Sequence, residues 1–209
     1  MNCKIVGYDY KSLEVELNPS ESFFCEKGAL VYHENGIEKD VRVIDKGLGG
    51  MLKRKISGES IFLVELNNRS GAAKKMLISG KMGLIPVDLK LFGGEIICRA
   101  GYYVASNRNV DVNFSLNLSS LISDMQLAMQ KISGDATVFL DSVGSAIRLD
   151  VKAESSVYVD EKHFICINAG SIGNLQSTFS ARGFLGGEGL SMYHITGPAT
   201  VYVSTQQTK

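Results

Sequence analysis

Two segments of this chain, ISGDATVFLDS at residues 132–142 and ITGPATVYVST at residues 195–205, are nearly the same phrase. In each, a Ser-Gly or Thr-Gly pair precedes a run in which apolar and polar residues alternate. Alternation with a period of two is typical of a half-buried β-strand, and glycine favours a turn before it. The repetition therefore predicts β-structure built from copies of one unit.

The same alternation recurs in short runs along the chain. With 22 Gly and only 3 Pro, the chain favours glycine turns between many short strands. This pattern predicts an all-β fold, either a sandwich or a roll resembling a β-helix. The runs are LEVEL (13–17), ESIFLVEL (59–66), VDVNFSL (110–116), TVFLD (137–141), AIRLDVK (146–152), SSVYVD (155–160) and TVYVST (200–205).

One segment has a mixed pattern. LSSLISDMQLAMQKI (118–132) places its apolar residues at helical spacing, but Met125, Leu127 and Met129 also alternate. We predict a short helical turn at 118–123 followed by a strand. A similar turn is predicted in GLGGMLKRK (47–55).

Two independent alignments of the sequence with itself, which we call registers, indicate three repeats. The first relates Gly71, Gly134 and Gly197, which lie 63 residues apart (134 − 71 and 197 − 134). The second aligns three longer segments: FFCEKGALVYHENG (23–36), IICRAGYYVASNRN (96–109) and YVDEKHFICINAG (158–170).

The second register places Cys25, Cys98 and Val159 at one position. It also superimposes Gly36, Asn109 and Gly170, and glycine and asparagine are the residues that most readily adopt a positive φ. We therefore expect one tight turn to be used three times.

The repeats predict the domain organisation. Three β-roll units, about 1–88, 89–150 and 151–209, fill the chain, and no Pro- or Ser-rich linker separates them. We expect a single domain, 1–209, with the three units in a pseudo-threefold arrangement around a shared core.

The sequence resembles a known family in several motifs. GESIFLVEL, GYYVASNRNVDV, ISGDATVFLDSVG and GGEGLSMYHITGPATVYVST occur in the order seen in the altered-inheritance-of-mitochondria family, which includes bacterial members. The resemblance covers nearly the whole chain, and GPATVYVST is its most specific part. It implies a TRAP-like fold, meaning a short variant of the double-stranded β-helix like that of the tryptophan RNA-binding attenuator protein. It implies no catalytic residues.

The composition of the chain argues against some classes of binding partner and cellular location. Lys plus Arg and Asp plus Glu both number 22, so the chain lacks the basic field that drives nucleic-acid binding. No apolar run reaches the roughly 18 residues of a transmembrane helix, and no apolar secretory segment opens the sequence. We expect a cytoplasmic protein without a transmembrane segment or nucleic-acid partner; peripheral membrane contact stays open. The four cysteines should be reduced and mostly packed in the core.

Two Gly-Glu pairs are candidate interface or loop residues. Gly58 and Glu59 match Gly187 and Glu188 in position, and each pair leads into a strand that ends at a Ser-Gly or Thr-Gly turn. Paired carboxylates a few ångström apart could perform acid–base chemistry, but equivalent corners of a symmetric object more often point outward. Gly197, in the repeated turn, joins this set.

A basic run and three histidines are the remaining candidates for a binding site. Lys53, Arg54 and Lys55 form a basic run that could contact an anion, although solvated lysines more often protect sheet edges. Three histidines, His33, His163 and His194, lack the HxH spacing of a cupin metal site. We therefore predict no metal, no cofactor and no catalytic residue.

The sequence favours a non-enzymatic structural or interaction protein. Repeated β-units without a convergent polar cluster point to homo-oligomer formation or docking on a protein partner through exposed sheet edges and flat faces. The alternative is a small-ligand binding module with a cleft between repeat units, which an apolar pocket with a few polar groups would support.

Overall fold

The structure is a computed structural model of the chain and describes residues 1–43, 62–114, 128–179 and 191–207. These residues are nearly all β, as predicted, with short 3-10 helices between some strands. The turns predicted at 118–123 and 47–55 lie outside the described residues. No helix in the described part is long and apolar enough to cross a membrane.

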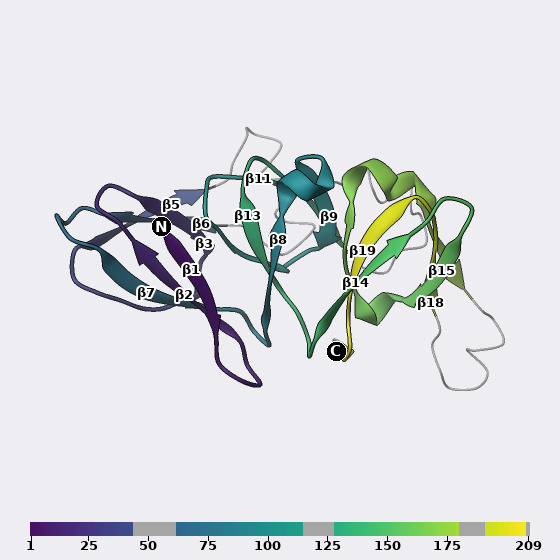
Figure 1. Cartoon of the computed structure of the whole chain (residues 1–209), viewed down its shortest axis with the longest axis horizontal. Coiled ribbons are helices and arrows are strands. Elements are labelled where there is room, and N and C mark those ends of the chain that lie inside the picture. Colours follow the sequence, from purple (N-terminus) through teal and green to yellow (C-terminus); the bar gives the residue numbers. More distant parts are fainter. Residues whose placement is uncertain (44–61, 115–127, 180–190, 208–209) are drawn as a thin grey trace. The chain divides into compact units, whose positions relative to one another are not determined.

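The described residues cluster into two compact units, each containing two antiparallel sheets (Figure 1). Unit 1 comprises Met1–Asp88, Gly101–Val112 and Gly134–Asp141. Unit 2 comprises Leu89–Ala100, Asn113–Ser133 and Ser142–Lys209. The predicted repeat 89–150 contributes segments to both units. The three repeats and their pseudo-threefold arrangement stay predictions.

The first sheet of unit 1 has the strand order β1-β2-β7-β4. Its strands are β1 (Asn2–Val6), β2 (Ser12–Leu17), β7 (Lys74–Ser79) and β4 (Leu30–His33). The second has the order β5-β6-β3-β10-β13-β8. Its strands are β5 (Ile37–Val43), β6 (Phe62–Asn68), β3 (Ser22–Glu26), β10 (Tyr103–Ser106), β13 (Thr137–Asp141) and β8 (Leu84–Asp88).

Unit 2 contains a six-stranded sheet of order β11-β12-β9-β16-β19-β14. The first two residues of β11 are assigned to unit 1 and its last two to unit 2. Its strands are β11 (Asp111–Phe114), β12 (Met129–Ser133), β9 (Glu95–Arg99), β16 (Phe164–Asn168), β19 (Ala199–Ser204) and β14 (Ala146–Val151). The second sheet has the order β15-β18-β17. Its strands are β15 (Ser156–Asp160), β18 (Ser191–Thr196) and β17 (Leu175–Phe179).

Three short 3-10 helices connect strands: η1 (Leu89–Phe92), η2 (Glu161–His163) and η3 (Ala169–Asn174). Asp160 caps η2, because its carboxylate accepts a hydrogen bond from the backbone N–H of Lys162 at 2.8 Å. This bond satisfies one of the donors that a helix start leaves without an internal partner.

Each unit has its own apolar core, formed by the inward-facing residues of its strands. In unit 1, β2 alternates buried and half-buried residues, which places Leu13, Val15 and Leu17 in the core. In unit 2, the ring of Tyr193 meets that of Phe164 edge-to-face, with centroids 5.3 Å apart. Burying side chains of this kind supplies about 1.5–3 kcal/mol each, so these cores provide the main driving force for folding.

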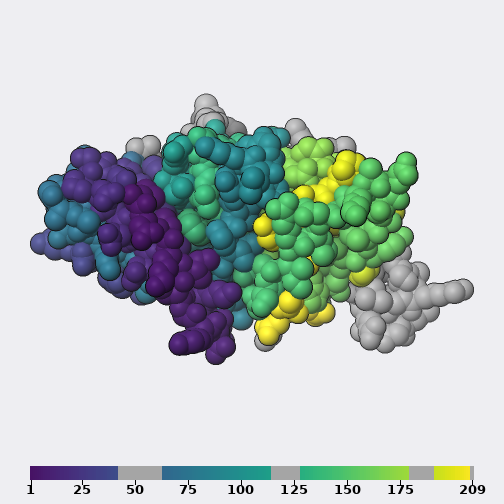
Figure 2. Space-filling model, in the orientation of Figure 1, coloured from purple at the N-terminus to yellow at the C-terminus, as the bar shows by residue number. Residues whose placement is uncertain are grey.

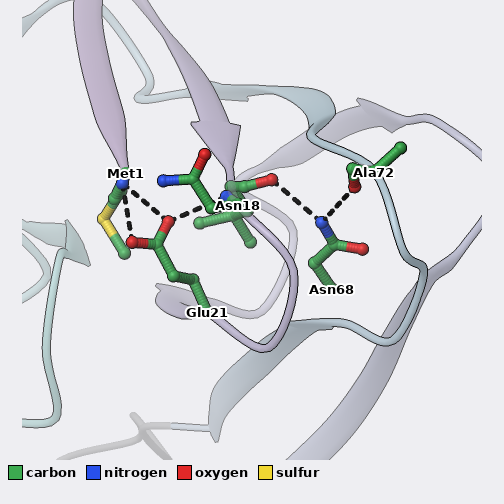
Figure 3. Close-up of polar contacts among 6 residues, drawn as sticks. Met1, Asn18, Glu21, Asn68 and Ala72 are labelled. Atoms are coloured by element: carbon green, nitrogen blue, oxygen red, sulfur yellow. Dashed lines mark hydrogen bonds and ion pairs between the residues drawn. The ribbon is translucent and has the colours of Figure 1, made fainter.

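A buried asparagine closes one corner of unit 1 (Figure 3). The side-chain nitrogen of Asn68 donates hydrogen bonds to the carbonyls of Leu17, at 2.9 Å, and Ala72, at 2.8 Å. Beside it, the N-terminal ammonium of Met1 donates to the Glu21 carboxylate at 2.7 Å. That bond holds the pKa of Glu21 below its usual range. Polar groups thus join the end of β2 to loops that are distant in sequence.

The predicted strands are present, including β12 after the mixed segment. The predicted threefold turn is wrong in its backbone conformation. Gly36 has a φ of 101°, but neither Asn109 nor Gly170 has a positive φ, and Gly170 lies inside η3. A helical turn reverses the chain with negative φ angles, so the shared glycine or asparagine at this position did not require one geometry.

Candidate functional site

A hollow lies in unit 2. It has a volume of about 300 Å³ and is formed where β14 and β16 end and β19 begins. Its lining residues are Asp150, Val151, Lys152, Asn168, Ser171, Pro198, Ala199 and Thr200.

Polar groups around this hollow bind one another. Asn168 Oδ1 accepts a hydrogen bond from the backbone N–H of Thr200 at 2.8 Å, and its Nδ2 donates to Ser171 Oγ at 2.8 Å. Thr200 Oγ1 donates to Asp150 Oδ1, also at 2.8 Å. These side chains hold the turns around the hollow, so the hollow by itself does not favour the small-ligand hypothesis.

Gly197, predicted as an interface or loop residue, occupies the turn beside this hollow. Its backbone N–H donates to the carbonyl of Ser155 at 2.9 Å. A Cβ at this position would overlap the carbonyl oxygen of Lys152 and lie 2.7 Å from that of Val151. The repeated Thr-Gly turn therefore uses glycine for a close approach between two backbone segments.

The remaining predicted site residues have no described position. Gly58, Glu59, Gly187, Glu188, Lys53, Arg54 and Lys55 all lie in segments outside the described residues. Their predicted roles in an interface, a loop or an anion contact stay predictions.

The three histidines occupy separate environments. A ring nitrogen of His163 lies 2.7 Å from the carbonyl oxygen of Ser204, and one of His33 lies 3.0 Å from that of Glu34. The ring of His194 stacks on Tyr158, with centroids 4.6 Å apart. Within the described ranges, no group of three or more His, Cys, Asp or Glu side chains is arranged to hold a metal ion.

The cysteines are free, and all but Cys3 are buried. Burial raises the pKa of Cys25 and Cys98 to about 12 and that of Cys3 to about 11. Burial likewise raises the pKa of Cys166 well above its ordinary value. A thiol must ionise to act as a nucleophile or metal ligand, so at neutral pH these four behave as packing groups.

A buried carboxylate was not anticipated from the sequence. Glu161 in η2 is only 5% exposed, and its Oε1 accepts hydrogen bonds from Ser177 Oγ, at 3.1 Å, and Ser191 Oγ. Burial is the main cause of the raised pKa of Tyr193, and the charge of Glu161 also contributes. The segment DEKH reads as a surface turn, so no signal in the sequence marked Glu161 as buried.

Several sheet edges carry exposed apolar side chains. The exposed fractions are 57% for Val31 and 46% for Tyr32 on β4, and 61% for Tyr158 on β15. Val41 on β5 and Ile147 on β14 are also exposed. All four strands are edge strands among the described residues. An edge strand offers unpaired backbone groups to another chain, and apolar side chains beside them strengthen such pairing.

Two further aromatic residues lie at the tip of the β1–β2 hairpin, which projects from unit 1 (Figures 1 and 2). Tyr8 is 98% exposed and Tyr10 69% exposed. Gly7 permits this tight turn, because its φ is 95° and a Cβ would lie 2.7 Å from the carbonyl oxygen of Tyr10. The hairpin tip is a second apolar surface.

These observations define an all-β protein of antiparallel sheets whose edge strands carry exposed apolar residues. The chain belongs to the family described as mitochondrial biogenesis AIM24, whose model matches residues 3–206. This confirms the family resemblance seen in the sequence motifs. None of the curated proteins matches this sequence.

The fold also resembles that of a solved structure. A crystal structure of a protein from Streptococcus pyogenes superimposes with a TM-score of 0.70 and is 16% identical in sequence. The match covers 99% of this chain and 94% of the streptococcal chain. At this identity the likeness supports the fold alone.

Proposed function

We propose that this protein is a non-enzymatic structural or interaction protein that works by self-association through its exposed sheet edges. The observation that carries the proposal is that five of the nine exposed large apolar side chains among the described residues lie on edge strands: Val31, Tyr32, Val41, Ile147 and Tyr158.

The unfavourable free energy of leaving apolar edge strands in water supports this proposal. An exposed, apolar edge strand promotes pairing between chains, and natural proteins usually blunt such edges with lysine, proline or a cover. Here the middle of β4 is Val31 followed by Tyr32, and the middle of β15 is VYV. A stable partner would remove these groups from water, as burial of apolar area requires.

The site chemistry agrees with a role in binding. The described thiols are protonated near neutral pH, and the polar groups around the hollow in unit 2 are engaged with one another. Reduced cysteines fit the expected cytoplasmic location. The proposal also includes docking of a different protein partner on the same sheet edges.

Native mass spectrometry and sedimentation velocity test the proposal. At tens of micromolar protein, we expect a discrete oligomer or a concentration-dependent assembly with no added mass. A protein that stays a monomer across this range contradicts self-association. A reproducible bound small molecule would instead favour the ligand-binding alternative.

A further inference from the structure

Together, the two shorter sheets contain the strands of a third six-stranded arrangement and one additional strand, β1. The sheets β5-β6-β3-β10-β13-β8 and β11-β12-β9-β16-β19-β14 have the same order, since adding six to each strand number of the first yields the second. Adding six once more gives β17-β18-β15, and the next three numbers lie beyond the last strand of the chain. Subtracting six from β10, β13 and β8 of the first sheet gives the strands that would follow, β4, β7 and β2. The three-stranded sheet ends at β15, and the four-stranded sheet ends at β4.

The pairing that would join these sheets occurs twice inside the chain. At the centre of one six-stranded sheet, β10 pairs with β3, with Ala105 opposite Cys25 and Ser106 opposite Phe24. At the centre of the other, β16 pairs with β9, with Cys166 opposite Cys98 and Ile167 opposite Ile97. Among the described strands, the equivalent pair β4 and β15 is not formed.

Local geometry supports the equivalence of β4, β10 and β16. Each strand pairs on its other side with a strand that follows a glycine turn, and each shows one register shift at the same place. The shifts fall between Leu30 and Tyr32, between Tyr103 and Ala105, and between Phe164 and Cys166. β4 therefore has the backbone form of the two strands that already pair in the sheet centres.

The strands on either side of the missing pairing are less buried than their equivalents in the two six-stranded sheets. All residues of β10 are buried, as are the first four of β16, whereas β4 exposes 57% of Val31 and 46% of Tyr32. Similarly, the three central residues of both β3 and β9 are buried, whereas β15 exposes 61% of Tyr158. The exposed apolar residues thus occupy positions that the two formed pairings cover.

We propose that β4 of one copy pairs antiparallel with β15 of a second copy, which completes across the subunit boundary a third sheet with the strand order of the other two, extended by β1 beyond β2. The internal pairings fix the register: Tyr32 lies opposite Val159, and His33 lies opposite Tyr158. The contact joins two different surfaces of the same chain, so each copy uses both and the assembly closes into a ring or extends as a filament. This inference rests on the proposed self-association and specifies its interface.

Charged substitutions on the two edges test the pairing. Tyr32→Lys and Tyr158→Lys each place a charge at an exposed position of the contact, and each should weaken association at least tenfold in sedimentation velocity, roughly the effect of 1.4 kcal/mol. Met82→Lys and Leu91→Lys are controls at exposed apolar positions outside the edge strands, 41% and 71% exposed, and they should assemble as the unmodified chain does. Circular dichroism checks that all four fold.

Mixing the two variants gives a sharper result. The Tyr32→Lys chain keeps an intact β15, and the Tyr158→Lys chain keeps an intact β4. At a protein concentration where neither variant dimerises alone, an equimolar mixture should therefore form a 1:1 dimer that does not extend further. An interface that uses one surface twice cannot produce this result.

Cross-linking tests the register and distinguishes two copies from one. Residues directly opposite in an antiparallel pair have Cα atoms about 4.5–5.5 Å apart, within the range of a disulfide. Mixed Tyr32→Cys and Val159→Cys chains should form a covalent dimer containing one of each on oxidation. No dimer from the mixture, together with an internal disulfide in the double variant, would overturn pairing between copies.

The outcomes separate this inference from the proposed function. If the unmodified chain assembles, and Tyr32→Lys and Tyr158→Lys assemble equally well, the β4–β15 pairing is wrong and self-association stands. If the unmodified chain stays monomeric at tens of micromolar, self-association itself fails. Loss of assembly in both edge variants but in neither control supports the pairing.

Discussion

Cys98 and Cys166 lie directly opposite each other across the pairing of β9 with β16, and both are fully buried free thiols. The side-chain amide of Gln130 donates to Cys98 Sγ at 3.4 Å. Burial, the main cause, raises the pKa of Cys98 to about 12. The centre of this sheet therefore contains sulfur that is shielded and protonated.

Alkylation should distinguish these thiols from Cys3. At pH 8, iodoacetamide should leave Cys98 and Cys166 unmodified in the folded protein, because thiol reactivity requires the thiolate and access to solvent. Cys3 is partly exposed and has a pKa of about 11, so it should react first. Peptide mass spectrometry measures each site. Rapid modification of Cys98 before unfolding would contradict the buried assignment, and unfolded protein provides the fully reactive control.

Gly80→Ala should destabilise unit 1. A Cβ on Gly80 would overlap Asp141 Oδ1 and lie 2.9 Å from the carbonyl oxygen of Gly83. That carboxylate accepts hydrogen bonds from the backbone N–H of Lys81, at 2.9 Å, and of Met82, at 3.3 Å. Displacing it should reduce the free energy of unfolding by about 1–3 kcal/mol in urea denaturation.

Gly71→Ala is the matched control. No atom lies within 4 Å of a Cβ at Gly71, and its φ is not positive. Alanine should leave the free energy of unfolding unchanged or increase it by up to about 1 kcal/mol, because it restricts the unfolded chain. Equal losses for both variants would show that the loss at Gly80 does not come from contact with Asp141.

Loss of the hydroxyl should lower the free energy of unfolding at one buried tyrosine but not at another. The hydroxyl of Tyr103 lies 2.8 Å from Ser106 Oγ, and the tyrosine is 2% exposed. Tyr193 is 0% exposed, and its hydroxyl has no hydrogen-bond partner among the described residues. Tyr103→Phe should therefore cost about 0.5–1.5 kcal/mol, whereas Tyr193→Phe should be neutral or stabilising. A large loss in Tyr193→Phe would show that its hydroxyl is bonded in solution.

Asp141 should give the stability of unit 1 a specific pH dependence. Burial, the largest effect, raises the pKa of Asp141 despite hydrogen bonds from Lys81 and Met82 that favour its ionised form. A raised pKa in the folded state means that the native protein retains this proton more tightly than the unfolded chain does. The associated stability is present below the unfolded pKa and is lost as pH rises through the folded pKa.

Asp141→Asn isolates this dependence. The difference in free energy of unfolding, unmodified minus variant, should decrease between about pH 3 and neutral pH and then level off. Urea titrations at several pH values measure it, and the constant cost of the amide does not affect the slope. An increase with pH over this range would mean that the backbone donors outweigh burial at Asp141.

The strands were predictable because their cause is local. LEVEL, TVFLD and SSVYVD alternate with the period of a half-buried strand, and β2, β13 and β15 formed there. The repeated Ser-Gly and Thr-Gly turns were also visible as recurring phrases. The family followed from the order of these motifs.

The burial of Glu161 and the exposure of Tyr32 and Tyr158 depended on the tertiary structure. Tyr32 aligns with the buried Ala105 and Cys166, so its pattern alone predicts a buried position. It is exposed because burial of a strand requires a neighbouring strand, and that neighbour is specified by pairing between distant segments. By itself the sequence determined where strands and turns form, because alternation and backbone preference are local. Only the tertiary structure decided which edges stay open, because hydrogen-bond pairing is not local.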